Sequence, residues 1–241
     1  MKQAVPDATG TSADLPGKTA QIDWNRTPFA SLDVAHRPTR HNDPGHRELA
    51  LYHLRFPAPE SPVLALESAL APDEKARLAP MAPARRLEFT MLRALLRIVL
   101  GDLMGLPADH VPLQIDASGK PVVPGDSGPW FNLSHTQHQG LCAIDLRGPV
   151  GVDLELTTRQ PRTSMEAIAA RILSPEALTA IEGAEGSDRA AVFLRQWVRN
   201  EAAGKALGTG LRRGGSLDAT LEIHDLTDIP GCVAAIARMQ R

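Results

Sequence analysis

The sequence predicts an α+β protein made of two similar halves, roughly residues 46–145 and 146–241. Two observations favour this fold class. Each half contains one long segment with helical periodicity, and each half ends in a glycine-containing apolar strand after that helix. The similarity does not establish a repeat, but it fits two related subdomains with a cleft between them.

The first 45 residues are expected to form an extended or partly disordered arm. They are rich in Pro, Gly, Thr, Asp and His and show no sustained periodicity. Trp24 and Phe29 could anchor part of this arm against the body. Residues 49–56 are apolar enough for a strand, and Pro72 marks the first turn of a helix.

A long buried helix is expected over residues 83–100, and it carries one narrow basic stripe. At about 100° per residue, four of its polar side chains fall within about 60° of one another. These are Arg86, Thr90, Arg93 and Arg97. The stripe is either a solvent edge at which the arginines extend into water, or a cationic wall that binds a polyphosphate.

Turn signals and alternation define the remaining elements. Gly119-Lys120-Pro121 predicts a turn into a short strand. Ser134 and Gln137 have capping-box spacing, which predicts a single helical turn whose N–H groups could hold an anion. The other expected elements are strands at 140–144, 151–155, 220–223 and 232–236, a helix that begins at Ser174, and a long helix at 189–207.

Composition excludes several classes of protein. A net charge of -2 does not favour nucleic-acid binding. No apolar run approaches the roughly 20 residues of a membrane span, and the N-terminus does not resemble a secretory signal. Cys142 and Cys232 lack metal-ligand spacing, so we expect reduced thiols. The sequence therefore predicts a cytoplasmic protein that binds neither nucleic acid nor membranes.

Three carboxylates point to a metal-dependent reaction. Alternation places Asp153 and Glu155 on one face of their strand, and Glu201 lies on the apolar side of its helix together with Trp197. If they converge, they suit Mg²⁺, with Mn²⁺ as the alternative, and a phosphate-bearing substrate. The competing interpretations are the polar face of an edge strand and a surface salt bridge between Glu201 and Lys205.

His135 and Lys120 have several interpretations. His135 could ligate a metal with His138, act as a capping or core histidine, or donate to a phosphate at a helix N-terminus. The neighbouring Asn132 and Ser134 favour the phosphate. Lys120, which follows Gly119, is by itself most simply interpreted as a lysine in a turn.

Five motifs together resemble the 4′-phosphopantetheinyl transferases. They are Phe131-Asn-Leu-Ser-His135, Gly151-Val-Asp-Leu-Glu155, Trp197-x-x-x-Glu201-Ala202-x-x-Lys205, Gly119-Lys120-Pro121 and Phe89-x-x-x-Arg93. The resemblance spans about residues 71–237, and it is to the larger, pseudo-dimeric class of surfactin-synthetase-activating type. Each motif is modest alone, but their common order and spacing are specific.

The resemblance implies a pseudo-twofold fold with the active site between the halves. It also implies a monomeric enzyme that uses Mg²⁺ and coenzyme A as co-substrate. Such an enzyme transfers the phosphopantetheine arm to a serine of an apo acyl or peptidyl carrier protein and releases 3′,5′-ADP. Carrier proteins of this kind serve fatty acid, polyketide and non-ribosomal peptide biosynthesis.

The resemblance also assigns roles to individual residues. The implied metal ligands are Asp153, Glu155 and Glu201. The implied coenzyme-binding residues are Arg86, Arg93, Lys120, Pro121, Asn132, Ser134, His135, Asp153 and Lys205. The implied catalytic residues are Glu201, Lys205 and His135, with Glu201 or an activated water as the base.

One departure from the family pattern concerns the residue before the motif glutamate. The family usually has lysine there, and this chain has Asn200. A catalytically silent coenzyme A-binding partner of a synthase is therefore one alternative. A metal-dependent phosphohydrolase that uses the same carboxylates is the other.

Overall fold

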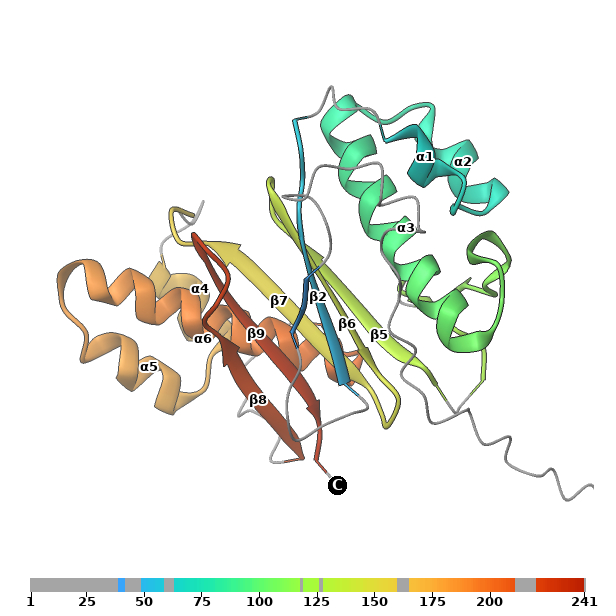
Figure 1. The fold of residues 1–241 in the computed structure, drawn as a ribbon. Coiled ribbons are helices and arrows are strands. Elements are labelled where there is room, and N and C mark those ends of the chain that lie inside the picture. Colours follow the sequence, from blue (N-terminus) through green and yellow to red (C-terminus); the bar gives the residue numbers. More distant parts are fainter. Residues whose placement is uncertain are drawn as a thin grey trace, which may run out of the picture.

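The computed structural model has a mixed α and β architecture with two main sheets (Figure 1). It describes residues 39–41, 49–58, 63–117, 119–125, 128–159, 165–210 and 220–240. The two sheets lie at the centre, with α1, α2 and α3 on one side and α4 and α5 on the other (Figure 1). Within these residues, no helix is both long and apolar enough to cross a bilayer.

The first sheet is antiparallel and has the strand order β1-β2-β6-β5. Its strands are β1 (Thr39–His41), β2 (Leu49–Arg55), β6 (Gln139–Asp145) and β5 (Trp130–His135). The expected strands at 49–56 and 140–144 are confirmed. Residues 39–41 of the expected irregular arm form β1 instead, and the rest of that arm up to residue 45 lies outside the described residues.

Three helices lie beside the first sheet, and α3 is the one that packs against β6: they are α1 (Leu64–Glu67), α2 (Pro72–Leu78) and α3 (Pro83–Met104). The expected helix starts at Pro72 and Pro83 are confirmed. Leu92, Leu95 and Leu96 of α3 are buried in one core with residues of β2 and β6, as the apolar periodicity requires. A 3-10 turn, η3 (Ala108–His110), and a small hairpin of β3 (Gln114–Ile115) and β4 (Pro121–Val122) follow.

The expected helical turn at Ser134–Gln137 is wrong. Residues 130–135 form β5, which pairs with β6 along its whole length. Pairing along six residues gives hydrogen-bond partners to the backbone groups of β5 that face β6. A single helical turn would form only a few hydrogen bonds, which do not offset the free-energy cost of helix nucleation. The strand also places Asn132 and Ser134 on the same face, two residues apart.

The second sheet is antiparallel, with the order β7-β9-β8, and three helices accompany it. The strands are β7 (Val150–Leu156), β9 (Cys232–Met239) and β8 (Leu221–Leu226), and the helices are α4 (Met165–Ile172), α5 (Pro175–Glu182) and α6 (Gly186–Leu207). Ser174 caps α5 by accepting a hydrogen bond from the Ala177 amide (3.2 Å), as its sequence predicts. All the strands and helices expected here are confirmed.

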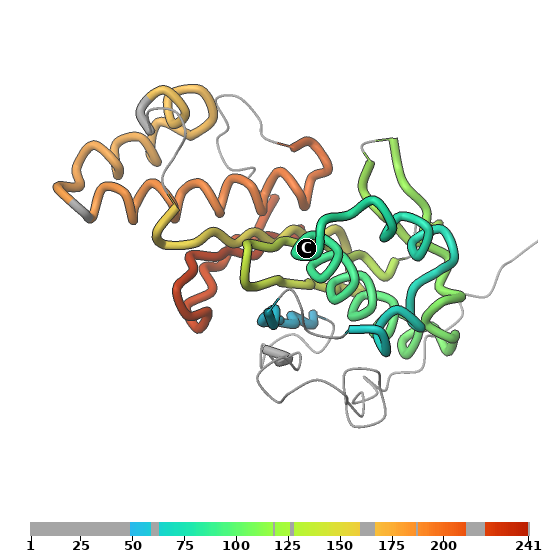
Figure 2. The backbone as a smooth tube through the Cα atoms, turned by 90° about the horizontal axis from the view of Figure 1, so that it is seen from above, coloured from blue at the N-terminus to red at the C-terminus, as the bar shows by residue number. Residues whose placement is uncertain are grey.

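The two sheets join where β5 runs beside β7 (Figure 2). The Val152 amide donates to the Asn132 side-chain oxygen (3.0 Å), so a side chain takes the place of a backbone ladder partner. Leu51 and Leu141 of the first sheet share an apolar cluster with Val152 and Ile236 of the second. The halves therefore have a continuous core across their junction.

Arg93 and Arg97 of the basic stripe of α3 face α2 rather than water. Glu74 is 1% exposed and accepts the Ala71 amide (3.1 Å), while both Arg93 and Arg97 form ion pairs with its carboxylate. Arg97 also donates to two carbonyl oxygens, those of Ala108 and Val111 (3.1 Å each). The interpretation of the stripe as a free cationic wall is wrong for these two arginines, because a buried carboxylate neutralises them.

Gly151 allows β7 to lie directly against the α6 backbone. A Cβ at this position would lie 2.0 Å from the Ala202 carbonyl oxygen and 2.5 Å from the Ala206 nitrogen. We expect Gly151→Ala to lower the free energy of unfolding by about 1–3 kcal/mol, because main-chain atoms would have to separate.

Urea denaturation measures this loss of stability. Gly148→Ala is the matched control, since nothing lies within 4 Å of the position that its added methyl group would take. Equal stability of the two variants would contradict the close approach of β7 and α6.

Candidate functional site

Asp153 lies at the centre of the candidate site, on the β7 face that packs against α6. Val152 and Leu154 point the other way into the core, so alternation sends Asp153 toward the helix. The carboxylate is buried, and its Oδ1 accepts hydrogen bonds from Ser134 Oγ (2.8 Å) and Lys205 Nζ (2.6 Å). Its Oδ2 is buried without a hydrogen-bond partner. A buried carboxylate oxygen of this kind needs a cation or donor to offset its lost hydration.

Lys205 connects α6 to both sheets. Besides Asp153, its ammonium donates to the Val152 carbonyl oxygen (3.1 Å) and to Ser134 Oγ (3.2 Å). The Ser134 hydroxyl therefore accepts from Lys205 while it donates to Asp153. The structure brings Ser134, Asp153 and Lys205 together, and it places Ser134 in contact with the carboxylate.

Glu201 lies one helical turn before Lys205 and approaches the same carboxylate. Burial raises the pKa of Glu201, the negative charge of Asp153 raises it further, and Lys205 and Arg159 oppose the shift. Two carboxylates in one partly buried site resist simultaneous ionisation unless a cation joins them. Asp153 and Glu201 thus form an electrostatically strained pair.

We expect Glu201→Gln to stabilise the metal-free protein at neutral pH. With the folded-state pKa of Glu201 above its ordinary 4.5, the protonated acid adds stability below that value, and this contribution is lost as the pH rises through the folded-state pKa. The glutamine removes the cost of ionisation at pH 7.

Thermal unfolding in EDTA tests this expectation. The melting temperature of Glu201→Gln should exceed that of the wild type at pH 7, and the difference should shrink as the pH falls toward 4.5. Glu182→Gln, an exposed position on α5, is the control. A lower melting temperature for Glu201→Gln at pH 7 would contradict the strained pair.

Lys120 reaches the site from the small hairpin of the first half. Its ammonium donates to the Lys205 carbonyl oxygen (3.4 Å), and Pro121 follows it as the first residue of β4. Burial lowers the pKa of Lys120, with Asp116 opposing and the charge of Lys205 adding to the shift. A second cation therefore lies near Lys205, as a site for anionic groups requires.

His135 lies at the end of β5 and interacts with the first turns of α3. Arg85 Nη1 donates to His135 Nε2 (2.9 Å), and Glu88 lies 3.6 Å from the same nitrogen. Burial lowers the pKa of His135, Glu88 opposes this shift, and the charges of Arg85 and Lys205 increase it. His135 is therefore a neutral acceptor here, and Arg85 supplies the positive charge.

Arg85 and Glu88 were missed because the sequence interpretation followed the stripe of Arg86. Residue 85 lies about 100° around the helix from residue 86, on the side that faces β5. Arg86 instead donates to Glu67 (2.7 Å), and Arg93 is held by Glu74. The structure brings neither of these two predicted coenzyme-binding arginines to Asp153.

Glu155 is held apart from the other carboxylates. It forms an ion pair with Arg159, whose guanidinium lies over the Trp197 ring, 5.3 Å from its centroid. Among the described residues, no three His, Cys, Asp or Glu side chains are close enough to hold a metal. The expected convergence of Asp153, Glu155 and Glu201 on one point is therefore not present in this part of the chain, although the charge of Asp153 acts on Glu201.

Asn132 and Asn200 have structural roles. Asn132 pairs with the Val152 amide, as described above. Asn200 is buried and donates to the Ile172 carbonyl oxygen at the end of α4 (2.9 Å). The missing lysine at this position therefore removes no cation from the neighbourhood of Asp153. Gly204, next to the motif lysine, is also explained, since a Cβ there would lie 2.3 Å from the Gly210 carbonyl oxygen.

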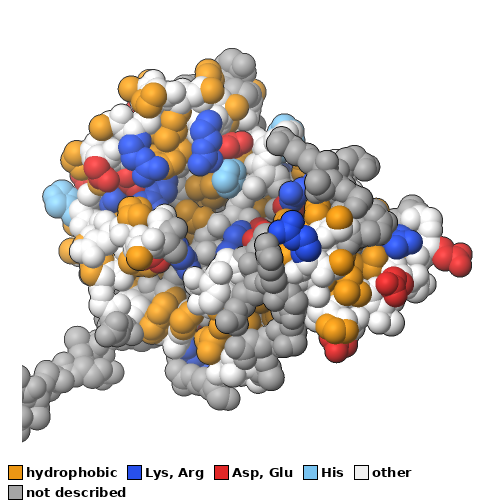
Figure 3. All heavy atoms as spheres, turned by 180° about the vertical axis from the view of Figure 1, so that it is seen from behind, with side chains coloured by type: hydrophobic (Ala, Val, Ile, Leu, Met, Phe, Trp, Pro, Cys, Tyr) orange, Lys and Arg blue, Asp and Glu red, His pale blue; other side chains and the backbone are white. Residues whose placement is uncertain are grey.

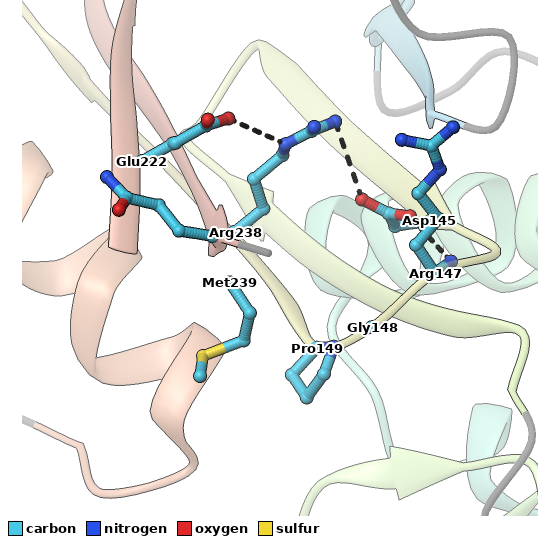
Figure 4. Close-up of a pocket in the computed structure, with 8 residues that line it drawn as sticks. Asp145, Arg147, Gly148, Pro149, Glu222, Arg238 and Met239 are labelled. Atoms are coloured by element: carbon cyan, nitrogen blue, oxygen red, sulfur yellow. Dashed lines mark hydrogen bonds and ion pairs between the residues drawn. The ribbon is translucent and has the colours of Figure 1, made fainter. Parts of the chain in front are cut away.

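The face seen in Figure 3 carries Lys, Arg and His side chains around its middle, between the two helix-bearing sides. A pocket of about 310 Å³ lies elsewhere, at the β6–β7 turn and the ends of β8 and β9 (Figure 4). It contains Arg238 between Glu222 (3.2 Å) and Asp145 (3.9 Å), and none of the predicted site residues lines it. Its buried arginine is already paired with two carboxylates.

Comparisons with known proteins assign the family. A family profile of the 4′-phosphopantetheinyl transferase superfamily matches residues 149–239. The chain is 30% identical to the 4′-phosphopantetheinyl transferase HetI of Nostoc sp. over 209 residues, which cover 79% of this chain and 87% of HetI. The chain belongs to the 4′-phosphopantetheinyl transferase superfamily. Its enzyme class is accordingly that of a phosphopantetheinyl transferase.

Other members of the superfamily match over shorter regions. The chain is 29% identical to the human L-aminoadipate-semialdehyde dehydrogenase-phosphopantetheinyl transferase over 62% of this chain and 51% of that protein. It is 31% identical to AcpT of Salmonella typhimurium over 43% of this chain and 53% of AcpT. The superfamily match includes Asp153, Glu201 and Lys205, so the cluster described above lies within the region that the family profile recognises.

Proposed function

We propose that this chain transfers the 4′-phosphopantetheine arm of coenzyme A to a serine of an apo acyl or peptidyl carrier protein and releases 3′,5′-ADP. Family membership supports the reaction class. The observation that carries the proposal for this site is the buried Asp153 oxygen without a partner, beside the strained Glu201. Both features are typical of a site that binds a cation, which in turn can bind a polyphosphate.

The donor set fits a hard divalent cation, Mg²⁺ or Mn²⁺. Asp153 and Glu201 would hold it, because carboxylate oxygens are the ligands these ions prefer. Glu155 would join them only after it leaves Arg159. Such an ion, when bound, neutralises charge on the pyrophosphate of the co-substrate.

The remaining residues would bind and orient the reactants. Lys120 and Lys205 lie close together and would hold phosphate oxygens, since ammonium groups neutralise charge that develops in phosphoryl transfer. Arg85 would extend this positive surface beside His135. Glu201 is the proposed base for the carrier serine hydroxyl, either directly or through a water.

We also propose that residues 46–145 and 146–241 act as two subdomains with the site at their junction. Contacts between the two segments support this division. Lys120 donates to Lys205, and Ser134 donates to Asp153. In each pair, one partner comes from each half of the chain.

A carrier assay tests the function. The full chain, coenzyme A and Mg²⁺ are incubated with a panel of apo carrier domains, and intact-protein mass spectrometry detects the added phosphopantetheine. Carriers whose acceptor serine is replaced by alanine, and reactions with EDTA, are the controls. Folded protein that modifies no carrier would contradict the proposal, and release of phosphopantetheine without a carrier would indicate a phosphohydrolase.

A further inference from the structure

A basic side chain that no family motif marks lies beside Glu155, just after the end of β7. Arg159 follows β7 and forms an ion pair with Glu155 four residues earlier. Its guanidinium also lies over the Trp197 ring on α6. Trp197 is one helical turn before Glu201, so Arg159 spans the gap between the two elements that carry the carboxylates.

The acids of β7 each interact with a different internal cation. Lys205 donates to Asp153, and Arg159 pairs with Glu155. The charge of Arg159 also acts on Glu201, where it opposes the rise in pKa. A divalent ion that takes Glu155 as a ligand therefore has to displace the guanidinium of Arg159. The Trp197 ring and the negative charge of Glu201 both help to hold that guanidinium in place.

We propose that Arg159 is a positioning residue that competes with the divalent cation for Glu155 and so sets the cation concentration at which Asp153, Glu155 and Glu201 bind the ion. This inference rests on the proposed metal-dependent function. Arg159 pairs with Glu155 in the metal-free protein. When the cation binds, the carboxylate exchanges the guanidinium for the metal, and the free energy of the ion pair is subtracted from the binding free energy.

The size of the effect follows from the exposure of the pair. The side chains of Arg159 and Glu155 are 41% and 21% exposed, so water screens their attraction. Removing the guanidinium should therefore lower the dissociation constant for Mn²⁺ by about two- to fivefold rather than by orders of magnitude.

Binding of Mn²⁺ to the full chain tests the proposal, with the free ion measured by electron paramagnetic resonance. We expect Arg159→Gln to bind Mn²⁺ about two- to fivefold more tightly than the wild type. In a Glu155→Gln background the same substitution should give a clearly smaller gain, because no Glu155 carboxylate is left to release and only the charge of Arg159 near Glu201 is removed. Arg195→Gln is the matched control, since Arg195 is an exposed arginine on α6 that lies 3.8 Å from Asp225.

Three outcomes would overturn the proposal. The first is equal or weaker binding by Arg159→Gln. The second is an equal gain in the Glu155→Gln background, which would indicate general electrostatics rather than competition for one ligand. The third is wild-type Mn²⁺ binding that Asp153→Asn leaves intact; it would place the ion elsewhere and remove the proposed metal site together with this inference.

Discussion

Asp153→Asn is expected to reduce kcat/KM for phosphopantetheine transfer by about 10²–10³-fold. Asparagine keeps the size of the side chain and can still accept the hydrogen bond from Ser134. It removes the negative charge that holds Lys205 and that would bind the cation together with Glu201. The loss should lie mainly in kcat, because the charge matters most as the pyrophosphate bond breaks and 3′,5′-ADP leaves.

Mass-resolved initial rates on one carrier measure this loss, and circular dichroism confirms that the variant is folded. Asp145→Asn is the matched control, because Asp145 is also a buried strand aspartate but pairs with Arg238 in the separate pocket. Its kcat should remain within about threefold of the wild type, as expected for a site outside the chemistry. Equal losses in both variants would show that the Asp153 effect is structural.

Glu74→Gln is expected to lower the free energy of unfolding by about 3–5 kcal/mol, the cost of breaking a buried charge cluster by removing one partner. Both Arg93 and Arg97 would then keep their charges with no carboxylate beside them. Burial already lowers the pKa of Arg93, and Glu74 is the main group that opposes this shift. The arginines therefore depend on Glu74.

Urea denaturation of Glu74→Gln and Glu67→Gln gives the comparison. Glu67 pairs with Arg86 at 2.7 Å, but the two side chains are 22% and 41% exposed, so its loss should cost about 0–1 kcal/mol. A cost for Glu74→Gln as small as that for Glu67→Gln would contradict the buried cluster and reopen the interpretation of the stripe as a phosphate wall.

Local sequence patterns predicted how the site residues lie within each single strand or helix. Alternation on β7 predicted that Asp153 lies on the strand face opposite Val152 and Leu154, and the helical period predicted that Glu201 and Lys205 lie one turn apart. These relations need only the geometry of one element. The family motifs then identified which of these residues belong together.

Partners distant in sequence were beyond such reasoning. Nothing local to the basic stripe shows that Glu74, on another helix, neutralises Arg93 and Arg97. The same limit applies to Arg85 and His135, which are 50 residues apart. Capping-box spacing at Ser134 was misleading, because pairing with β6 decides the conformation of that segment.

The absence of a side chain at Gly151 determines how the candidate site can vary. Since main chain touches main chain at this point, the distance between the strand that carries Asp153 and the helix that carries Glu201 does not depend on which apolar residues fill the surrounding core. Substitutions elsewhere in that core can accumulate without changing the spacing of the two acids. The spacing of Asp153 and Glu201 is thus set by the backbone contact at Gly151 rather than by side-chain packing.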